Sequence, residues 1–182
     1  MVADGEPDRP ADDAVEGLIR KISHLLDAED WTRLEKYCRQ YLSLRPDDVL
    51  GNQAFALALM KLDRIDEMAY PVRRLLEIAP DAGPSHEMAA RYWINRKEFR
   101  YSWWHARQLM SIDPRDATGY WLAGVCLVCL EKSGKGLVLL RHARTLEPDN
   151  AAIAEIELGM RTRIERSAAA RAEQHGELKQ AL

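Results

Sequence analysis

Two of the three cysteines, Cys126 and Cys129, stand in the stretch GVCLVC at the spacing C-x-x-C. This spacing occurs in thiol–disulfide enzymes, in half of a zinc site, and in helices that bury two small side chains one turn apart. A redox pair requires its first thiol at an exposed helix N-terminus, where the helix dipole and nearby cations lower the thiol pKa. A structural zinc site requires four Cys or His ligands.

The neighbours of this cysteine pair favour packing over chemistry. The segment 120–130 is rich in apolar residues and contains no cation, and no second closely spaced Cys/His pair occurs in the chain. We therefore interpret Cys126 and Cys129 as packing residues inside a helix, and we predict neither a metal nor a cofactor.

Two other short motifs could carry chemistry, and both are incomplete. His86-Glu87 lacks the second histidine of an H-E-x-x-H zinc helix, and SGKG at 133–136 lacks the preceding strand and the full pattern of a phosphate loop. We interpret SGKG as a turn between two helices. Because neither motif is complete, the sequence predicts a protein that is not an enzyme.

The composition excludes several classes of protein. The chain has 182 residues, 47% of them apolar and 30% charged, which is enough for one domain or a short repeat array. A net charge of -3 argues against a nucleic-acid partner, and no apolar run approaches the roughly 20 residues of a membrane span. The acidic start, MVADGEPDRPADD, is unlike a secretory signal, and an odd set of cysteines argues against disulfides. These features predict a cytoplasmic protein.

Four prolines recur at intervals of 34 residues: Pro46, Pro80, Pro114 and Pro148. Because proline cannot continue a helix and the Asp or Asn that follows can cap the next one, each marks a helix boundary. Apolar residues between these boundaries fall at helical spacing in two blocks, and no segment alternates as a strand would. The sequence therefore predicts an all-α fold of helix-turn-helix repeats.

The second repeat holds one further proline, Pro71, inside the expected helix 65–78. A proline in a helix interior removes a backbone hydrogen bond and clashes with the preceding turn. We therefore expect a kink, or a delayed start of this helix near Ala69.

The 34-residue period resembles that of the tetratricopeptide repeat (TPR) family. The repeat 117–150 carries the family's signature residues at Ala117, Tyr120, Ala123, Gly124, Leu127, Ala143 and Pro148. The resemblance implies a right-handed α-solenoid of four repeats at 15–48, 49–82, 83–116 and 117–150. Residues 1–14 are predicted to form a disordered acidic N-terminal arm.

A solenoid closes its end with an element that has one polar face, and residues 151–182 are predicted to supply it. The apolar stripe of this capping helix consists of Ile153, Ile156, Met160 and Ile164, with Glu157 and Arg161 placed where a following helix would demand apolar residues. The Arg/Ala-rich tail beyond Ile164 is either a solvated extension or a docking helix for a partner.

The resemblance also implies a concave groove, lined by the first helix of each repeat, that holds a peptide or helix of a partner protein. The residues at groove-facing positions are Arg20, Gln53, Leu57, Met60, Lys61, Glu87, Met88, Arg91, Ile94, Asn95, Trp121 and Val125. Ile19 and Ser23 stand where the TPR subfamily that clamps heat-shock chaperones needs Lys and Asn, so that clamp is absent.

An apolar groove with cationic edges suits an amphipathic helix or an apolar-anchored extended segment. The alternative is that the groove is covered by the N-terminal arm, the tail or a second copy of the chain. The resemblance thus implies a non-enzymatic adaptor, co-chaperone or assembly factor. A small TPR chaperone like those of type III secretion and a self-assembling scaffold remain open, and a thiol-redox or metal protein is the least supported.

Overall fold

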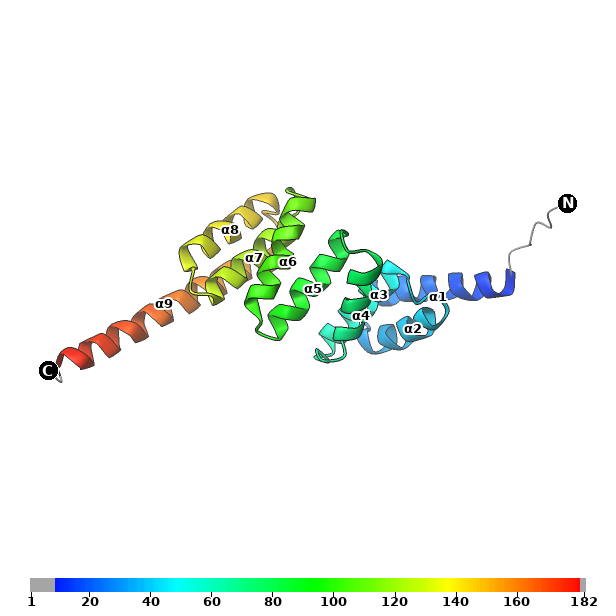
Figure 1. The fold of residues 1–182 in the computed structure, drawn as a ribbon, viewed down its shortest axis with the longest axis horizontal. Helices are drawn as coiled ribbons and strands as arrows, with labels where there is room; N and C mark the ends of the chain where they lie inside the picture. The colour runs from blue at the N-terminus through cyan, green and yellow to red at the C-terminus, as the bar shows by residue number, and fades with distance from the viewer. Residues whose placement is uncertain (1–8, 181–182) are drawn as a thin grey trace. The chain divides into compact units, whose positions relative to one another are not determined.

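A computed structural model describes the backbone of residues 9–180 and the side chains of residues 13–173. Every regular element in this part of the chain is an α-helix (Figure 1), so the predicted all-α fold class is confirmed. The helices are α1 (Arg9–Asp27), α2 (Trp31–Leu44), α3 (Val49–Lys61), α4 (Ala69–Ile78), α5 (Gly83–Asn95), α6 (Phe99–Ile112), α7 (Ala117–Cys129), α8 (Ser133–Leu146) and α9 (Ala151–Gln180).

The 34-residue period is visible in the backbone of the turn inside each repeat. Among the described residues, the non-glycine residues with positive φ are Glu29, Asp63, Lys97 and Glu131, each 34 residues after the last, with φ between 52° and 62°. In each repeat the next N–H donates to a carbonyl five residues back in the first helix, at 2.8–3.1 Å. This is the hydrogen bond that closes a helix end with a left-handed residue, and all four repeats share it.

At three of the four prolines, a following Asp or Asn caps the next helix, as predicted. The Asp48 carboxylate accepts from the N–H of Gly51 at 2.5 Å, and the Asp116 carboxylate accepts from the N–H of Thr118 at 2.8 Å. The Asn150 side chain accepts from Ala152 at 3.1 Å. Each satisfies an N–H that has no acceptor within its own helix.

In the second repeat, α4 begins only at Ala69, and Pro71 is its third residue. The delayed start is therefore confirmed. Pro71 is tolerated there because the first N–H groups of a helix have no partner within it, so a proline removes no hydrogen bond. The preceding turn is held by Glu67, which Arg64 contacts at 2.6 Å and Arg39 of α2 at 3.1 Å. The hydrogen bond from Arg64 lowers the pKa of Glu67.

The predicted arm 1–14 is wrong for its second part, because α1 begins at Arg9. Pro10 is compatible with the first turn of a helix, and Asp13 places negative charge near the N-terminal end of the helix dipole. Residues 1–8 lie outside the described part of the chain.

The interpretation of SGKG as a turn is also wrong, because Ser133–Gly136 forms the first turn of α8. A Cβ on Gly136 would lie 2.7 Å from the carbonyl oxygen of Gly124 and 2.6 Å from Cγ2 of Val128. The glycine is thus needed for the close approach of α8 to α7, not for a bend.

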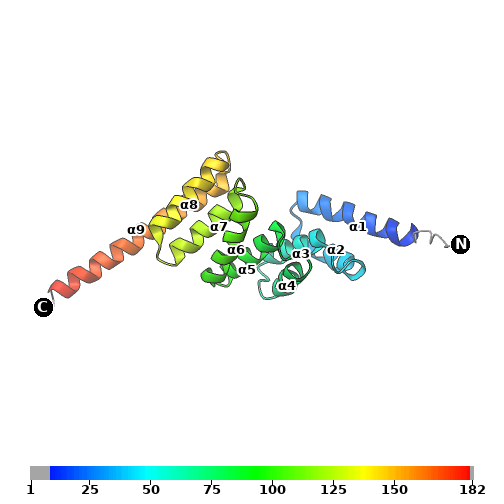
Figure 2. The ribbon, with the colours of Figure 1, turned by 45° about the horizontal axis from the view of Figure 1, so that its top comes forward.

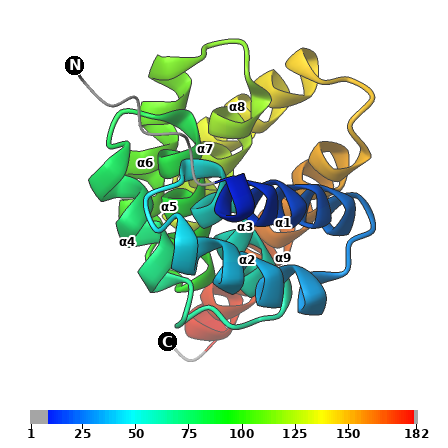
Figure 3. The same ribbon diagram turned by 90° about the vertical axis from the view of Figure 1, so that its right-hand side faces the viewer.

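The chain divides into two units, residues 1–92 and 93–182, with the boundary inside α5. In the first unit α2 packs against both α1 and α3, and α4 packs against α3 (Figure 3). The Ser85 hydroxyl of α5 donates to the Leu75 carbonyl of α4 at 3.0 Å. The largest fully buried side chains of this unit include Leu34, Leu59, Met68, Leu75, Asn52, Pro71 and Cys38.

In the second unit α7 packs against α6, α8 and α9, and α9 continues past the α7–α8 pair (Figure 2). Ile153 of α9 is buried in a cluster with Ala117 and Ala143, which places the start of α9 on the fourth repeat. The side chains of 165–173 are exposed. Whether this extension docks a partner stays a prediction.

Glu157 does not lie on a polar outer face of α9, as the sequence suggested, because its side chain is only 2% exposed. Three arginines compensate the buried carboxylate: Arg161 at 2.8 Å and, from α8, Arg144 at 3.1 Å and Arg141 at 3.7 Å. A carboxylate is buried only where partners replace its water. These contacts tie α9 to α8.

Candidate functional site

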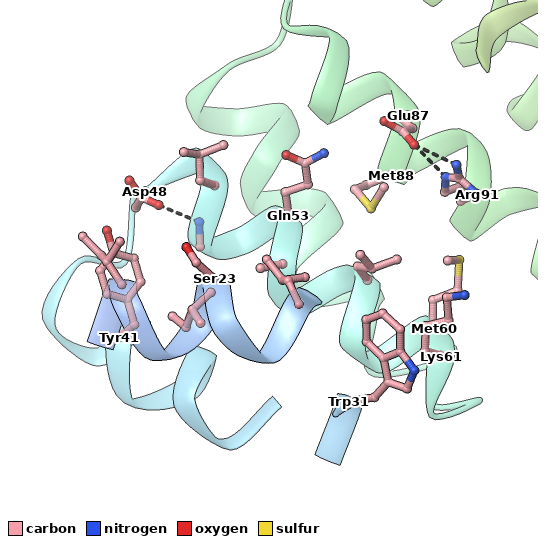
Figure 4. A pocket seen from close by; sticks show the side chains of 17 residues that line it. Ser23, Trp31, Tyr41, Asp48, Gln53, Met60, Lys61, Glu87, Met88 and Arg91 are labelled. Carbon is pink, nitrogen blue, oxygen red and sulfur yellow. Dashed lines mark hydrogen bonds and ion pairs between the residues drawn. The ribbon is translucent and has the colours of Figure 1, made fainter. Parts of the chain in front are cut away.

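Helices α1, α3 and α5 of the first unit, with parts of α2, surround a cavity of about 750 Å³ (Figure 4). Pockets of 300–1,000 Å³ are typical of binding sites. The lining residues are Ile19, Ile22, Ser23, Leu26, Trp31, Tyr41, Asp48, Leu50, Gly51, Gln53, Ala54, Leu57, Met60, Lys61, Glu87, Met88 and Arg91.

The walls of this cavity are mainly aliphatic, and part of them faces solvent. Leu50 is 72% exposed and Ile19 is 45% exposed, while Leu57 and Met60 are half-buried. Large apolar side chains gathered in a hollow at the surface mark a binding site more often than scattered ones do. The helical periodicity of α1 and α3 brings these residues to one side.

The polar groups of the cavity lie at its edge. Glu87 and Arg91, one turn apart on α5, form an ion pair at 2.8 Å (Figure 4). The Lys61 ammonium lies 5.2 Å from the ring centroid of Trp31, a cation–π contact across the end of the cavity. The Asp48 carboxylate is engaged as the cap of α3.

Seven of the twelve residues predicted for a partner groove line this cavity. Arg20 does not: it is exposed, pairs with Glu16 at 3.5 Å, and lines a separate hollow with Lys21 and Tyr37. Each residue of an α-helix is turned by about 100° from the one before. Ile19 therefore faces the cavity while Arg20 faces away from it. The seven that line the cavity are Gln53, Leu57, Met60, Lys61, Glu87, Met88 and Arg91.

Met88 lines the cavity, but only 2% of its side chain is exposed, so this predicted groove residue offers little surface to a partner. Its substitution by Glu would bury a charge and would test stability rather than binding. Met60, which is half-buried, is the more accessible methionine of this cavity.

The other four predicted residues, Ile94, Asn95, Trp121 and Val125, belong to the second unit, and none lines the cavity. Trp121 packs against the cluster of Ala117, Ala143 and Ile153. The resemblance placed Trp121 at a groove-facing position, but its side chain contributes to this inter-helix cluster. The capping helix contributes to this cluster, which one repeat alone could not reveal.

The sequence did not predict Leu50 or Trp31 as groove residues. Leu50 is in the first turn of α3, and its large apolar side chain at a solvent-facing position was the available signal. Trp31 begins α2, the second helix of its repeat, and reaches the cavity because it extends over Lys61. That contact depends on how α2 packs against α3.

The three cysteines lack the lowered pKa of a reactive thiol. Burial raises the pKa of Cys126 to about 11 and that of Cys38 to about 12, and burial also raises the pKa of Cys129. The Cys126 thiol donates to the Ser102 hydroxyl at 3.2 Å. A redox C-x-x-C needs a lowered pKa at a helix N-terminus, whereas Cys126 and Cys129 lie at the C-terminal end of α7.

Within residues 13–173 no group of three His, Cys, Asp or Glu side chains is arranged to hold a metal ion. Burial lowers the pKa of His86, the histidine next to Glu87. None of the helices over residues 9–180 has the length and apolar character that a bilayer crossing requires.

The amino-acid sequence matches no protein-family model and no curated protein sequence. Solved structures are similar in fold. MamA from Desulfovibrio magneticus RS-1, from residue 41 to its end, has a TM-score of 0.68 at 16% identity, covering 92% of this chain and 96% of that one. A thermophilic TPR protein from Thermus thermophilus has a TM-score of 0.71 at 16% identity, covering 80% and 82%. PilF from Pseudomonas aeruginosa has a TM-score of 0.70 at 12% identity, covering 90% and 74%.

These likenesses, together with the period of 34 in both sequence and backbone, establish the class of the protein by its fold. It is a protein of TPR fold, and residues 9–180 form four helix-turn-helix repeats followed by a long helix. The resemblance inferred from the prolines is confirmed at this level.

Proposed function

We propose that this protein is a non-enzymatic protein-binding module whose partner inserts apolar side chains into the cavity between α1, α3 and α5. The cavity carries the proposal: it is open, largely aliphatic and edged by charged groups. A buried group of apolar anchors within a polar rim is the common design of protein interfaces. Methionine and tryptophan walls adapt to ligands of different shape.

An amphipathic helix or a short extended segment fits this cavity. Either would bury apolar side chains against Leu50, Leu57 and Met60, and an acidic or amide group of the partner could meet Lys61 at the edge. This is the role of an adaptor, a co-chaperone or an assembly factor, acting in the cytoplasm. The C-x-x-C pair takes no part in it, since burial raises the pKa of both thiols.

The test is capture of partners by wild-type protein and by the variant Leu50→Glu, with identification by mass spectrometry. Leu50 is 72% exposed, so the variant should fold normally. Its carboxylate would stand in the apolar cavity, and we expect partner affinity to fall by at least about 2 kcal/mol, as at a hot spot. The matched control is Leu44→Glu in α2, which is 50% exposed and outside the cavity.

Two outcomes would contradict the proposal. If Leu50→Glu binds partners as wild type does while deletion of 166–182 abolishes binding, the tail of α9 is the docking element. If the wild-type chain is an oligomer in solution and Leu50→Glu is a monomer, a second copy occupies the cavity, and the protein is a self-assembling scaffold. Sedimentation of both proteins measures this directly.

A further inference from the structure

A second apolar surface lies in the other unit, where α6, α7 and α8 enclose two adjoining hollows of about 350 and 430 Å³. The hollows share Trp103 and Leu127, so they form one continuous surface. Helices α6 and α8 both pack against α7 (Figure 1). The lining residues are Arg100, Trp103, Trp104, Arg107, Met110, Ala123, Leu127, Leu130, Lys132, Lys135, Val138 and Leu139.

The apolar residues of this surface include two that solvent reaches freely. Val138 is 61% exposed and Trp104 is 50% exposed. Neither side chain belongs to the buried core of the unit, in which Leu122 and Leu140 are completely buried. Exposed Trp and Val around paired hollows form a surface that a partner can fill.

The charged residues that line the two hollows are all cations: Arg100, Arg107, Lys132 and Lys135. Arg107 lies over the ring of Trp103 at 5.0 Å, and none of the four makes an ion pair within the described residues. The neighbouring acid, Glu131, is paired with Arg171 at 3.2 Å. A chain with a net charge of -3 thus carries a locally positive apolar surface.

We propose that this surface binds an acidic segment of a partner protein that carries apolar anchors. The anchors would enter the hollows beside Trp103, Met110 and Val138, and carboxylates would meet the four cations. Charge complementarity of this kind selects the partner and orients it during association. The surface lies on different helices from the α1–α3–α5 cavity, so the inference does not depend on the proposed function of that cavity.

A protein segment fits the surface better than a nucleic acid or a lipid bilayer does. The hollow of about 350 Å³ is lined mainly by aliphatic side chains, Met110, Leu127, Val138 and Leu139 among them, which accept Leu or Phe rather than phosphate. Nucleic-acid surfaces pair cations with stacking faces along an extended track and usually belong to basic domains. Separate hollows suit separate side chains, and a bilayer presents none.

The experiment titrates the full-length protein into a fluorescein-labelled helical peptide of about 16 residues, about four turns, with leucines on one face and glutamates on the other. Two matched peptides replace the glutamates by lysines or the leucines by alanines. We expect the acidic peptide to bind with a Kd below about 100 μM and more weakly at high salt, and both matched peptides to bind at least about tenfold more weakly.

The variants are Val138→Glu, and Lys132→Glu combined with Lys135→Glu. All three positions are exposed, so the fold should be retained. Each variant should weaken the acidic peptide at least about tenfold. The matched control in the same unit, Leu158→Glu on α9, is 65% exposed and outside the hollows and should bind normally.

Several results would overturn the proposal. These are failure of the acidic peptide to bind, equal binding of the lysine peptide, and binding that Leu50→Glu abolishes while Val138→Glu leaves it intact. Single-stranded DNA and vesicles containing phosphatidylserine are titrated in parallel. If either binds wild type and loses binding in the lysine variants while the peptide does not bind, the surface belongs to that ligand class instead.

Discussion

The second and fourth repeats share one frame of 34 residues, yet their helices meet differently. Gly124 and Gly136 of the fourth repeat correspond to Ala56 and Met68 of the second. In the fourth repeat the two glycines place α7 and α8 in close contact, with a Gly124 oxygen 2.7 Å from where a Gly136 Cβ would stand. In the second repeat Met68 is fully buried ahead of α4, which begins only at Ala69.

Two different features of the sequence control the turns and the helix packing of these repeats. The turns and helix starts of both repeats follow local residues at matching positions, whereas the closeness of the paired helices follows side-chain volume. A glycine pair lets backbones approach, and a methionine at the same place fills the gap instead. A repeat can therefore keep its period while changing its packing.

The largest expected effect comes from adding one methyl group at the glycine contact. Gly136→Ala should lower the free energy of unfolding by about 2 kcal/mol, because overpacking costs more than the gain in helix propensity. Gly159→Ala in α9 is the matched control: nothing lies within 4 Å of its Cβ, so stability should rise. Urea unfolding followed by circular dichroism measures both, and equal effects would show that the glycine contact is unimportant.

Cys126 corresponds to Ala58 of the second repeat, so Cys126→Ala makes the two first helices alike at this position. Burial raises the Cys126 pKa from 9.0 to about 11, so above pH 9 the unfolded chain loses this proton while the folded chain keeps it. Each pH unit in this window therefore destabilises wild type by about 1.4 kcal/mol through this thiol.

Wild type should accordingly be more stable than Cys126→Ala at pH 8, where the variant lacks the contact with Ser102, and should lose that advantage between pH 9 and 11. Cys38, which titrates later, is present in both proteins and cancels in the difference. Unfolding curves at several pH values measure the difference. A constant gap would contradict the burial of the thiol.

The caps should behave alike in the two repeats. Asp48→Ala and Asp116→Ala each remove a carboxylate that accepts from the first turn of the following helix. Each should cost about 1 kcal/mol, the usual value of such a cap. Asp149→Ala, an exposed acid beside the cap Asn150, should change stability little. A large inequality between the two caps would mean that their local environments, not the shared frame, set their strength.

The smallest expected effects come from the left-handed turns. Glu131→Gly should raise stability by about 0.5–1 kcal/mol, because a side chain is disfavoured at a positive φ. Asp63→Gly, at the same place in the second repeat, should gain less, since aspartate adopts this conformation more readily. Thermal unfolding of both variants distinguishes them. A loss of stability in Glu131→Gly would show that its ion pair with Arg171 outweighs the backbone strain.

The candidate site was only partly predictable from the residues. Gln53, Leu57, Met60 and Lys61 share a helix, so one register placed them all, and they line the cavity together. Arg20 faces away from the cavity, and Met88 is too deeply buried to offer much surface to a partner. The exposure of a residue depends on how closely the neighbouring helix approaches, which a repeat register does not contain.

The sequence by itself determined the elements of this protein. Pro46, Pro80, Pro114 and Pro148 marked the ends of helices, and the acids or asparagine after them marked most of the starts, because caps and prolines act within a few residues of the chain. Even the late start of α4 followed from Pro71 alone.

Only the tertiary structure decided which faces are buried and which are open. It placed Glu157 among three arginines, Gly136 against Gly124, and the hollows beside Trp103 between α6 and α8. Burial and cavities arise where side chains from helices distant in sequence meet, and their free energies depend on volumes and distances that no local pattern fixes.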